Sequence, residues 1–143
     1  MILVTGGAGY VGSHSVKALR RAGHEPVVLD NFSTGRRELV QSGEVIEADL
    51  GDIQALRRAF ERKAFQAVLH FASLTQVGES MAEPHKYYGQ NLVGCLNLLE
   101  AMLGAGVKRL IFSSSAAVYG LPRETPIVET HPLEPTNPYG RTK

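Results

Sequence analysis

Short apolar, β-branched runs alternate with longer helical patterns along the whole chain. The runs are Ile2–Val4, Pro26–Asp30, Glu44–Ala48, Ala67–His70 and Arg109–Phe112. The helical patterns between them are Tyr10–Ala22, Asp52–Lys63 and His85–Gly104, with a weaker one near Arg36–Ser42. Strands that alternate with helices form a parallel sheet joined by right-handed crossovers. We therefore predict a doubly wound α/β domain with strand order 3-2-1-4-5 and a ligand crevice at the carboxyl ends of its strands.

Two segments, Phe71–Pro84 and Ser113–Pro138, show neither pattern, and the second holds most of the chain's seven prolines. Each follows a predicted strand at its carboxyl end, so we expect irregular loops that carry function there. On the longest helical pattern, apolar side chains recur at helical spacing, and we expect them to form its buried face. They are Leu92, Leu96, Leu99 and Met102.

The bulk composition excludes several classes of protein. The 143 residues have room for one domain, and a net charge of +1 provides no footprint for nucleic acid or an anionic membrane. No apolar run approaches the ~18 residues that cross a bilayer, and the N-terminus lacks a signal peptide's basic segment. Cys95 is the only cysteine, and the five histidines never fall at metal-ligand spacing. We expect a cytoplasmic protein that binds no metal.

A glycine-rich loop joins the first predicted strand to the first predicted helix. Its sequence, from Thr5 to Gly12, is Thr-Gly-Gly-Ala-Gly-Tyr-Val-Gly. Glycines let backbone N–H groups approach a pyrophosphate at a helix N-terminus, where a Cβ would intrude. Asp30 closes the second strand about 20 residues further on, where an acid binds a ribose diol. A structural turn is the alternative, but the combination with Asp30 predicts a dinucleotide-binding, Rossmann-type domain.

The charges near the end of the second strand bear on the choice of cofactor. The Asp30 carboxylate can accept hydrogen bonds from the 2′- and 3′-hydroxyls of adenosine, and it repels a 2′-phosphate. Arg36 and Arg37 raise the rival interpretation of a phosphate clamp for NADP. They lie several residues beyond the strand and Glu38 follows them, so a solvated helix start explains them as well. We predict NAD as the cofactor.

Tyr139 and Lys143 are four residues apart, on one face of a helix that Pro138 can begin. A tyrosine ordinarily titrates near pH 10, and an ammonium about 4 Å away supplies up to ~4 kcal/mol toward its ionisation. Before this pair, the run Ser113–Ser115 leaves the fifth strand toward the crevice and offers a hydroxyl for proton transfer. A surface pair is the alternative, but after a dinucleotide loop the set predicts catalysis.

Together these segments resemble the extended short-chain dehydrogenase/reductases and, within them, the UDP-glucose 4-epimerase family. The resemblance covers the whole chain. Its supporting stretches are Gly7–His14, Asp30-Asn31, His70–Ala72, Val77–Ser80, Tyr87-Tyr88, Asn91, Ser113–Gly120 and Pro135–Lys143.

The resemblance implies a set of site residues. Ser115, Tyr139 and Lys143 would be catalytic, and they would also contact NAD. The other residues implied to bind NAD are Gly6, Gly9, Tyr10, Val11, Gly12, Asp30, Asn31, Phe32, Ser33, Thr34, Gly35, Asp49, Leu50, Phe71, Ala72, Ser73, Leu74, Thr75 and Asn91. The chain departs from the family at Ser73 and Thr75, where some epimerases have glycine and lysine, so a direct cationic contact to the cofactor is missing.

The implied activity is the interconversion of UDP-glucose and UDP-galactose in galactose metabolism, through transient oxidation at sugar C4 by tightly bound NAD. Related dehydratases and decarboxylases carry an acid just after the serine, whereas this chain has Ala116 and Ala117. Dehydration is therefore disfavoured. Action on a UDP-uronic acid or a UDP-N-acetylhexosamine, and a non-catalytic NAD-binding module, stay open as alternatives.

Members of the family continue well beyond the position of Lys143. We therefore expect residues 1–143 to be an NAD-binding domain that is incomplete at its C-terminus and a poor catalyst alone. The family usually forms homodimers by pairing two helices from each subunit, and only His85–Gly104 is complete here. We expect a homodimer for the complete protein, and the state of this chain alone stays open.

Overall fold

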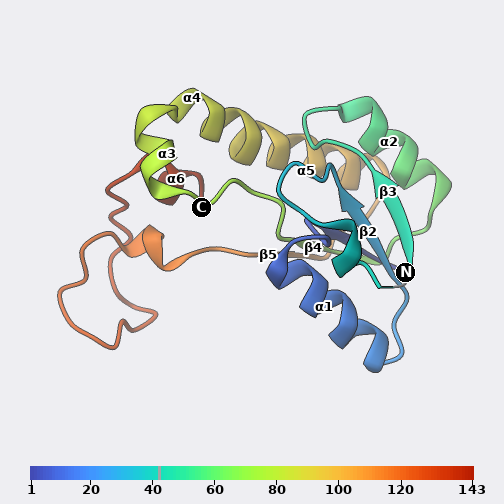
Figure 1. Cartoon of the computed structure of the whole chain (residues 1–143), viewed down its shortest axis with the longest axis horizontal. Helices are drawn as coiled ribbons and strands as arrows, with labels where there is room; N and C mark the ends of the chain where they lie inside the picture. The colour runs from blue at the N-terminus through green and yellow to red at the C-terminus, as the bar shows by residue number, and fades with distance from the viewer. Residues whose placement is uncertain (42) are drawn as a thin grey trace.

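The computed structural model describes residues 1–41 and 43–143. Among these residues, one five-stranded parallel sheet has the order β3-β2-β1-β4-β5 (Figure 1). The strands are β1 (Ile2–Thr5), β2 (Pro26–Asp30), β3 (Glu44–Glu47), β4 (Ala67–His70) and β5 (Leu110–Phe112). The predicted strand order is confirmed, and each predicted strand end lies within one residue of the observed one.

The α-helices are α1 (Tyr10–Arg21), α2 (Ile53–Arg62), α3 (Val77–Ala82), α4 (Pro84–Tyr87), α5 (Gly94–Gly104) and α6 (Pro138–Thr142). Two short 3₁₀ helices, η1 (Arg37–Leu39) and η3 (Ala116–Tyr119), and a π-helical segment, η2 (Tyr88–Val93), complete the helical elements of the described residues. The part of the weak Arg36–Ser42 pattern that is helical is η1, and Ser42 lies outside the described residues.

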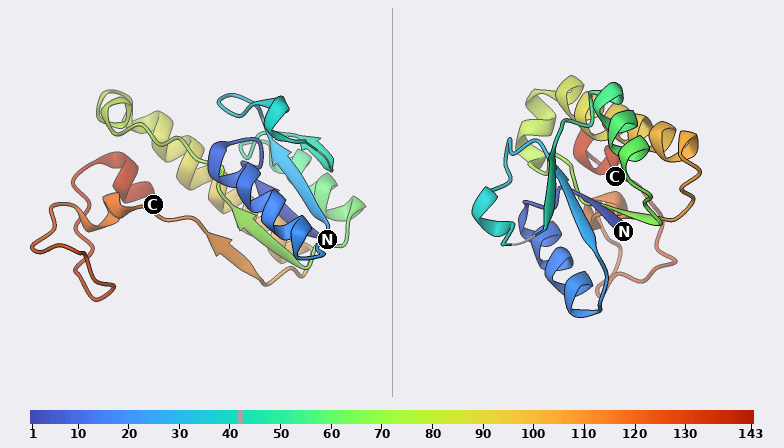
Figure 2. Two further views of the ribbon diagram at one scale, coloured as in Figure 1. Left: turned by 60° about the horizontal axis from the view of Figure 1, so that its bottom comes forward. Right: turned by 90° about the vertical axis from the view of Figure 1, so that its right-hand side faces the viewer.

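Helices cover both faces of the sheet, as Figure 2 shows. Neighbouring residues of a strand point to opposite faces, so Leu3 and Val4 belong to different cores. Val4 packs with Val16 of α1, whereas Leu3 packs with a larger cluster that contains Leu56 of α2 and Leu98 of α5. Leu3, Leu56 and Leu98 are fully buried, and each such side chain contributes about 1.5 to 3 kcal/mol to folding. These two cores hold the strand ends that form the site.

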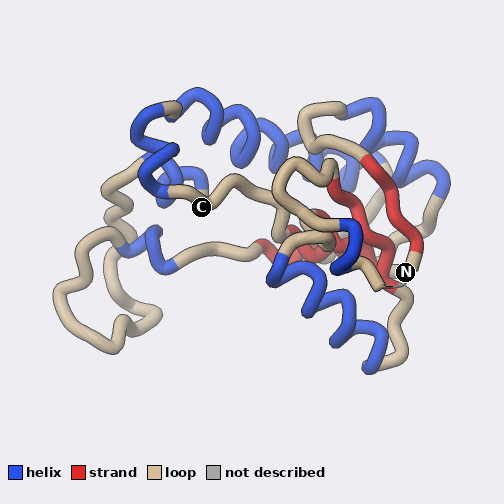
Figure 3. The backbone as a smooth tube through the Cα atoms, viewed as in Figure 1, coloured by secondary structure: helices blue, strands red, loops and turns tan. Residues whose placement is uncertain are grey.

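The longest helical run extends without a break from α4 through η2 into α5, and it is continuous in Figure 3. Its π-helical segment inserts one residue, which rotates the following side chains by about 100° relative to an uninterrupted α-helix. Leu98, Ala101 and Met102 form the buried face. The prediction was therefore wrong for Leu92 and Leu96, which are exposed.

The two segments predicted as irregular contain short helices. Phe71–Pro84 includes α3, and Ser113–Pro138 includes η3. Each is shorter than two turns, so too few residues repeat for a periodic pattern to appear in the sequence. In the second segment, a long loop between η3 and α6 forms the outlying lobe on the left of Figure 3. No helix within 1–41 and 43–143 has the length and apolar character to cross a lipid bilayer.

Candidate active site

The register of the sheet brings the carboxyl ends of β1, β2 and β4 together at one edge. Thr5, the last residue of β1, lies beside Leu29 of β2 and His70 of β4. The residues that follow these positions, Gly6, Asp30 and Phe71, therefore surround one crevice next to the central strand. This is the carboxyl edge, where the order of the strands reverses and a doubly wound sheet binds its ligand.

The glycine loop packs too tightly for a side chain at Gly12. A Cβ at this position would lie 2.1 Å from the Gly6 carbonyl oxygen. Gly9 caps α1 without a side-chain hydrogen bond, so the N–H groups of the first turn keep their capacity to bind an anion. The helix dipole adds partial positive charge at the same place. The loop thus has the geometry of a pyrophosphate cradle.

Asp30 ties the second strand to the glycine loop. It is only 7 % exposed, and its two carboxylate oxygens accept hydrogen bonds from the N–H groups of Ala8 and Phe32, each at 2.9 Å. A carboxylate has about four acceptor sites, so two of them stay free for the hydroxyls of a ribose. The rival phosphate clamp loses Arg37, whose guanidinium pairs with Glu47 and lies 4.0 Å from the centre of the Phe32 ring.

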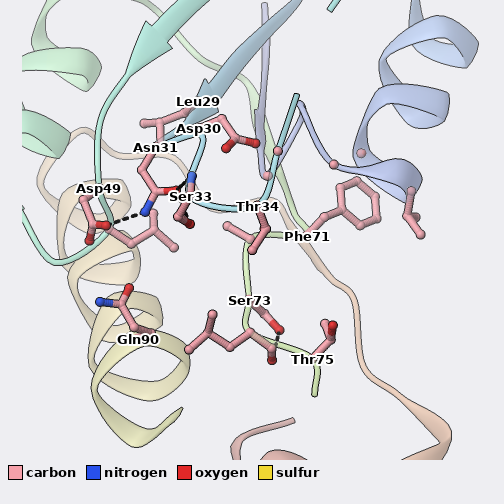
Figure 4. A pocket seen from close by; sticks show the side chains of 18 of the residues that line it. Leu29, Asp30, Asn31, Ser33, Thr34, Asp49, Phe71, Ser73, Thr75 and Gln90 are labelled. Carbon is pink, nitrogen blue, oxygen red and sulfur yellow. Dashed lines mark hydrogen bonds between the residues drawn. The ribbon is translucent and has the colours of Figure 1, made fainter. Parts of the chain in front are cut away.

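A pocket of about 340 Å³ runs along this edge (Figure 4). This volume is within the range of small-molecule sites. Among the described residues, those that line it are Gly6, Gly9, Tyr10, Val11, Gly12, Leu29, Asp30, Asn31, Ser33, Thr34, Gly35, Ala48, Asp49, Leu50, Phe71, Ala72, Ser73, Leu74, Thr75 and Gln90. Most positions that the family resemblance implied therefore come together in one cavity.

Five of the implied cofactor residues lie outside this lining: Phe32, Asn91, Ser115, Tyr139 and Lys143. Three lining residues were missed: Leu29, Ala48 and Gln90. Leu29 and Ala48 directly precede the implied Asp30 and Asp49, so the strand ends are the signal that could have found them. Gln90 directly precedes Asn91 on η2, and no sequence pattern marked the π-helical segment that orients it.

At the far end of the pocket, Asn31 and Asp49 lie side by side after β2 and β3. The Asn31 amide donates to the Asp49 carboxylate at 2.5 Å, and the dashed line in Figure 4 marks this bond. The same Asn31 side chain accepts from the N–H and hydroxyl of Ser33 at 3.0 and 2.7 Å. These bonds give the wall of the pocket a fixed shape where an adenine would lie.

Helix α6 docks on η3 and brings the predicted catalytic residues to one corner. Asn137 caps the helix, because its side chain accepts from the Gly140 N–H at 2.8 Å. A Cβ at Gly140 would lie 2.6 Å from the Ala117 carbonyl oxygen, so the two backbones approach closely. Ser115, which precedes η3, and Tyr139, which precedes Gly140, are therefore on segments in direct contact.

The three predicted catalytic side chains contact three different groups of the protein. The Ser115 hydroxyl accepts from the Ala117 N–H at 3.2 Å. The Tyr139 ring is 8 % exposed and meets the Tyr87 ring edge to face at 6.4 Å. The Lys143 ammonium donates to the Ser113 carbonyl at 2.8 Å. In the part of the chain that the structure describes, no hydrogen bond joins these three side chains to one another.

Two observations describe the reactive groups of this corner. The Tyr139 hydroxyl makes no hydrogen bond to another described residue, and no fully buried side-chain oxygen or nitrogen among those residues lacks a partner. The hydroxyl oxygen therefore keeps some solvent exposure, although the residue as a whole is buried. Burial holds the pKa of the Lys143 ammonium below its ordinary value, with an opposing effect from Cys95. The two ends of α6 thus carry a phenol without a hydrogen-bonding partner among the described residues and a partly desolvated cation.

His70 lies beneath this corner at the end of β4. It is 1 % exposed, its Nδ1 is 2.6 Å from the Thr5 hydroxyl, and its ring lies against Phe112. Burial, and secondarily the nearby Lys143 charge, lowers the pKa of His70 to about 4. The folded protein therefore holds this imidazole neutral.

This buried histidine predicts a loss of stability in acid. In the unfolded chain His70 binds a proton near pH 6.5, whereas in the folded chain it does so only near pH 4. The contribution of the neutral His70 to the free energy of unfolding is therefore complete above pH 6.5 and is lost as the pH falls toward 4. We expect a decrease of about 3 kcal/mol in the free energy of unfolding over this range. Urea denaturation at several pH values measures it. The slope should be smaller in His70→Asn and unchanged in His24→Gln, whose histidine is exposed; equal slopes in all three would contradict the assignment.

The fold and the site define a dinucleotide-binding α/β domain that brings a serine, a tyrosine and a lysine to the edge of its cofactor crevice. No group of three or more histidine, cysteine, aspartate or glutamate side chains in the described ranges could hold a metal ion. Residues 2–143 match the NAD dependent epimerase/dehydratase family. The chain therefore belongs to that family.

Known members of the family are similar along nearly the whole chain. The UDP-glucose 4-epimerase of Streptomyces lividans is 54 % identical over 99 % of this chain and 44 % of its own length. The crystal structure of UDP-glucose 4-epimerase from Brucella ovis in complex with NAD is 46 % identical, with a TM-score of 0.95 over 99 % of this chain and 43 % of that one.

A third similar structure is the UDP-Glc/GlcNAc 4-epimerase from Campylobacter jejuni, which is 45 % identical and also has a TM-score of 0.95. It is matched over 99 % of this chain and 45 % of its own. The chain thus spans less than half the length of the relatives it matches. Both structural matches cover nearly the whole chain, so they include the segments around Ser115 and Tyr139.

Proposed function

We propose that this chain is the NAD-binding part of a UDP-glucose 4-epimerase, which interconverts UDP-glucose and UDP-galactose. The single observation that carries this proposal is the continuity of the site, from Asp30 in the cofactor pocket to Tyr139 at its edge. The pocket-lining residue Leu74 and the helix of Tyr139 share one hydrogen-bonding partner, Asn91. The identities of the relatives support the substrate, because three of them act on UDP-glucose by name.

In the proposed reaction, each catalytic residue has one task. NAD, which the glycine loop and Asp30 would hold, would supply a reversible hydride acceptor for C4 of the sugar. Tyr139 takes the proton of the 4-hydroxyl and later returns it, and the Ser115 hydroxyl bridges this transfer. Lys143 holds the nicotinamide ribose and favours the ionised tyrosine. The Ala116 and Ala117 positions offer no carboxylate for elimination, which favours epimerisation over dehydration.

The residues of the pocket already have the geometry that NAD binding requires. Gly12 keeps the Gly6 carbonyl free of a side chain, the first turn of α1 offers N–H groups, and Asp30 retains acceptor sites for a diol. Phe32, implied by the resemblance, lies under Arg37 and closes the turn after Asp30. We propose that it supports the ribose site from outside the pocket.

A cofactor titration tests the proposal directly. We expect the chain to bind NADH at least ~10-fold more tightly than NADPH, because the Asp30 carboxylate repels a 2′-phosphate. Nicotinamide fluorescence measures both affinities. In Asp30→Asn the preference should shrink, whereas Arg37→Gln should keep it. A preference for NADPH would overturn the role of Asp30. Binding only by a full-length protein would mean that the remaining residues complete the site.

The substrate range has one specific alternative. The Campylobacter jejuni relative acts on both UDP-Glc and UDP-GlcNAc by name, at 45 % identity. A full-length protein that contains this chain should therefore be assayed on UDP-galactose and UDP-N-acetylgalactosamine in parallel. Activity on UDP-galactose without activity on UDP-N-acetylgalactosamine would identify an enzyme that is specific for the sugars without an N-acetyl group.

We also propose that the full-length protein is a cytoplasmic homodimer. The long helical run leaves apolar side chains exposed at Leu92, Val93, Leu96 and Leu103, which supports a helix-pairing interface of the kind that the family uses. The single Cys95 is compatible with a reducing compartment. Sedimentation of the full-length protein measures its oligomeric state.

A further inference from the structure

Asn91 is buried behind the pocket rather than open to it. Its side chain is on the π-helical segment η2, and the residue is 3 % exposed. The amide oxygen accepts from the Leu74 N–H at 2.8 Å, and the amide nitrogen donates to the Leu74 carbonyl at 3.0 Å. The neighbouring Gln90 is the one that lines the pocket. The Asn91 amide therefore holds the backbone of the pocket wall.

The same amide nitrogen also donates to the Thr142 hydroxyl at 3.0 Å, 51 residues further along the chain. Thr142 is 7 % exposed, and its hydroxyl donates in turn to the Tyr139 carbonyl at 2.8 Å. The direction of these bonds is fixed, because the amide NH₂ can only donate and the carbonyl can only accept. Leu74, Asn91, Thr142 and the Tyr139 backbone thus form one connected chain of hydrogen bonds.

Two features make this connection more than local helix packing. Helix α6 has only five residues, so its own hydrogen bonds cannot hold it in place. The described contacts of α6 include the Thr142 hydroxyl on Asn91, the Tyr139 ring against Tyr87, and Gly140 against Ala117. Of these contacts, the one through Thr142 also hydrogen-bonds to the Tyr139 carbonyl, so it holds the backbone from which the phenol projects.

We propose that Asn91 and Thr142 couple the pocket-lining segment 71–75 to the catalytic helix, and that Thr142 is a positioning residue for Tyr139. The inference rests on the proposed function, in which Tyr139 exchanges a proton with the sugar. Segment 71–75 lines the cofactor pocket. The Asn91 side chain therefore holds both the pocket wall at Leu74 and, through Thr142, the backbone of Tyr139.

Thr142→Val, in a full-length protein that contains this chain, is the most specific test because it removes the hydroxyl and keeps the shape. We expect kcat on UDP-galactose to fall at least ~10-fold, since misplacing a reacting group by a fraction of an ångström costs this much or more. KM and the affinity for NADH should stay within about twofold, because the Leu74 bonds to Asn91 remain.

Two companion variants separate the hydroxyl from packing. Thr142→Ser restores the hydroxyl and should recover most of kcat, whereas Thr130→Val, at an exposed position, should match the parent protein. A Thr142→Val protein that keeps its kcat would overturn the proposal. Equal losses in Thr142→Ser and Thr142→Val would overturn it as well, because the hydroxyl would then be irrelevant.

Asn91→Asp tests the other half of the connection, since the carboxylate keeps an acceptor for Leu74 but loses both donated bonds. We expect it to weaken NADH binding and lower kcat together. Adding Thr142→Val should then change kcat little further, because the single Thr142 proton can go to the new carboxylate or to the Tyr139 carbonyl but not to both, and the chain of bonds is broken either way. Asn97→Asp is the matched control: its amide donates to the Leu50 carbonyl at 2.8 Å and does not reach α6. The factor by which Asn97→Asp changes kcat should multiply the factor for Thr142→Val in the double variant, as expected for independent sites.

A failure of the proposed function is distinguishable from a failure of this inference. A full-length protein without activity on UDP-sugars would contradict the function alone, and the coupling would then be measured by melting temperature. The combined decrease in Asn91→Asp with Thr142→Val should be smaller than the sum of the separate decreases. Additive decreases would overturn the coupling whatever the substrate is.

Discussion

Replacing Gly12 with alanine is expected to raise the dissociation constant for NADH at least ~100-fold. The added Cβ would lie 2.1 Å from the Gly6 carbonyl oxygen, whereas carbon and oxygen normally approach to ~3.3 Å. The loop and α1 must therefore separate by about 1 Å, a displacement large enough to lose a positioned contact. The same strain should cost about 1 to 3 kcal/mol of stability. Fluorescence titration and thermal unfolding measure the two effects.

Gly78→Ala is the matched control, since a Cβ there meets no atom within 4 Å and the residue lies in the exposed part of α3. This variant should bind NADH as the parent does and melt at the same temperature or slightly higher, because alanine favours a helix. Equal NADH affinities in Gly12→Ala and the parent protein would show that the pyrophosphate does not bind at this loop.

Tyr139→Phe should lower kcat of the full-length enzyme by about 10² to 10⁴, the usual contribution of a general acid–base group. The ring is retained, so its packing against Tyr87 and the fold should persist. The hydroxyl that is removed makes no hydrogen bond to another described residue, and no protein group loses a partner. NADH affinity should therefore stay within a few-fold. Steady-state assays on UDP-galactose, with the NADH titration, separate the two properties.

Tyr88→Phe removes the same group from a solvent-exposed tyrosine on the long helical run and should leave kcat near that of the parent. If Tyr139→Phe retains activity within tenfold of the parent, another group takes the proton, and the catalytic assignment is wrong. If both variants lose NADH binding, the defect is in the fold.

The central part of the fold could be predicted because its signals are local. The three central strands β1, β2 and β4 are short apolar runs with buried side chains, the glycine loop directly follows β1, and Asp30 ends β2. The pairing of Thr5 with Leu29 and His70 then follows from the parallel topology, which brings the implied pocket residues to one edge. Such residues need only the correct strand order to be placed correctly.

The orientation of side chains on the long helical run could not be predicted from the sequence. A π-helical segment leaves no periodic pattern, so the sequence predicted Leu92 and Leu96 on the buried face and missed Gln90 in the pocket. Thr142 carried no signal either, because its importance depends on meeting Asn91 across 51 residues. Interactions that exist only after the chain has folded back on itself are invisible to spacing and composition.

The position of β1 in the sheet has a consequence for how the protein is made. Of the five strands of this sheet, the one synthesised first is the central one, with β2 and β3 added on one side and β4 and β5 on the other. Each newly synthesised strand can therefore join an edge that already exists. The pyrophosphate loop and Asp30 are synthesised close together, whereas Tyr139 follows more than a hundred residues after Asp30. During synthesis, the means of holding a cofactor thus precede the means of using it.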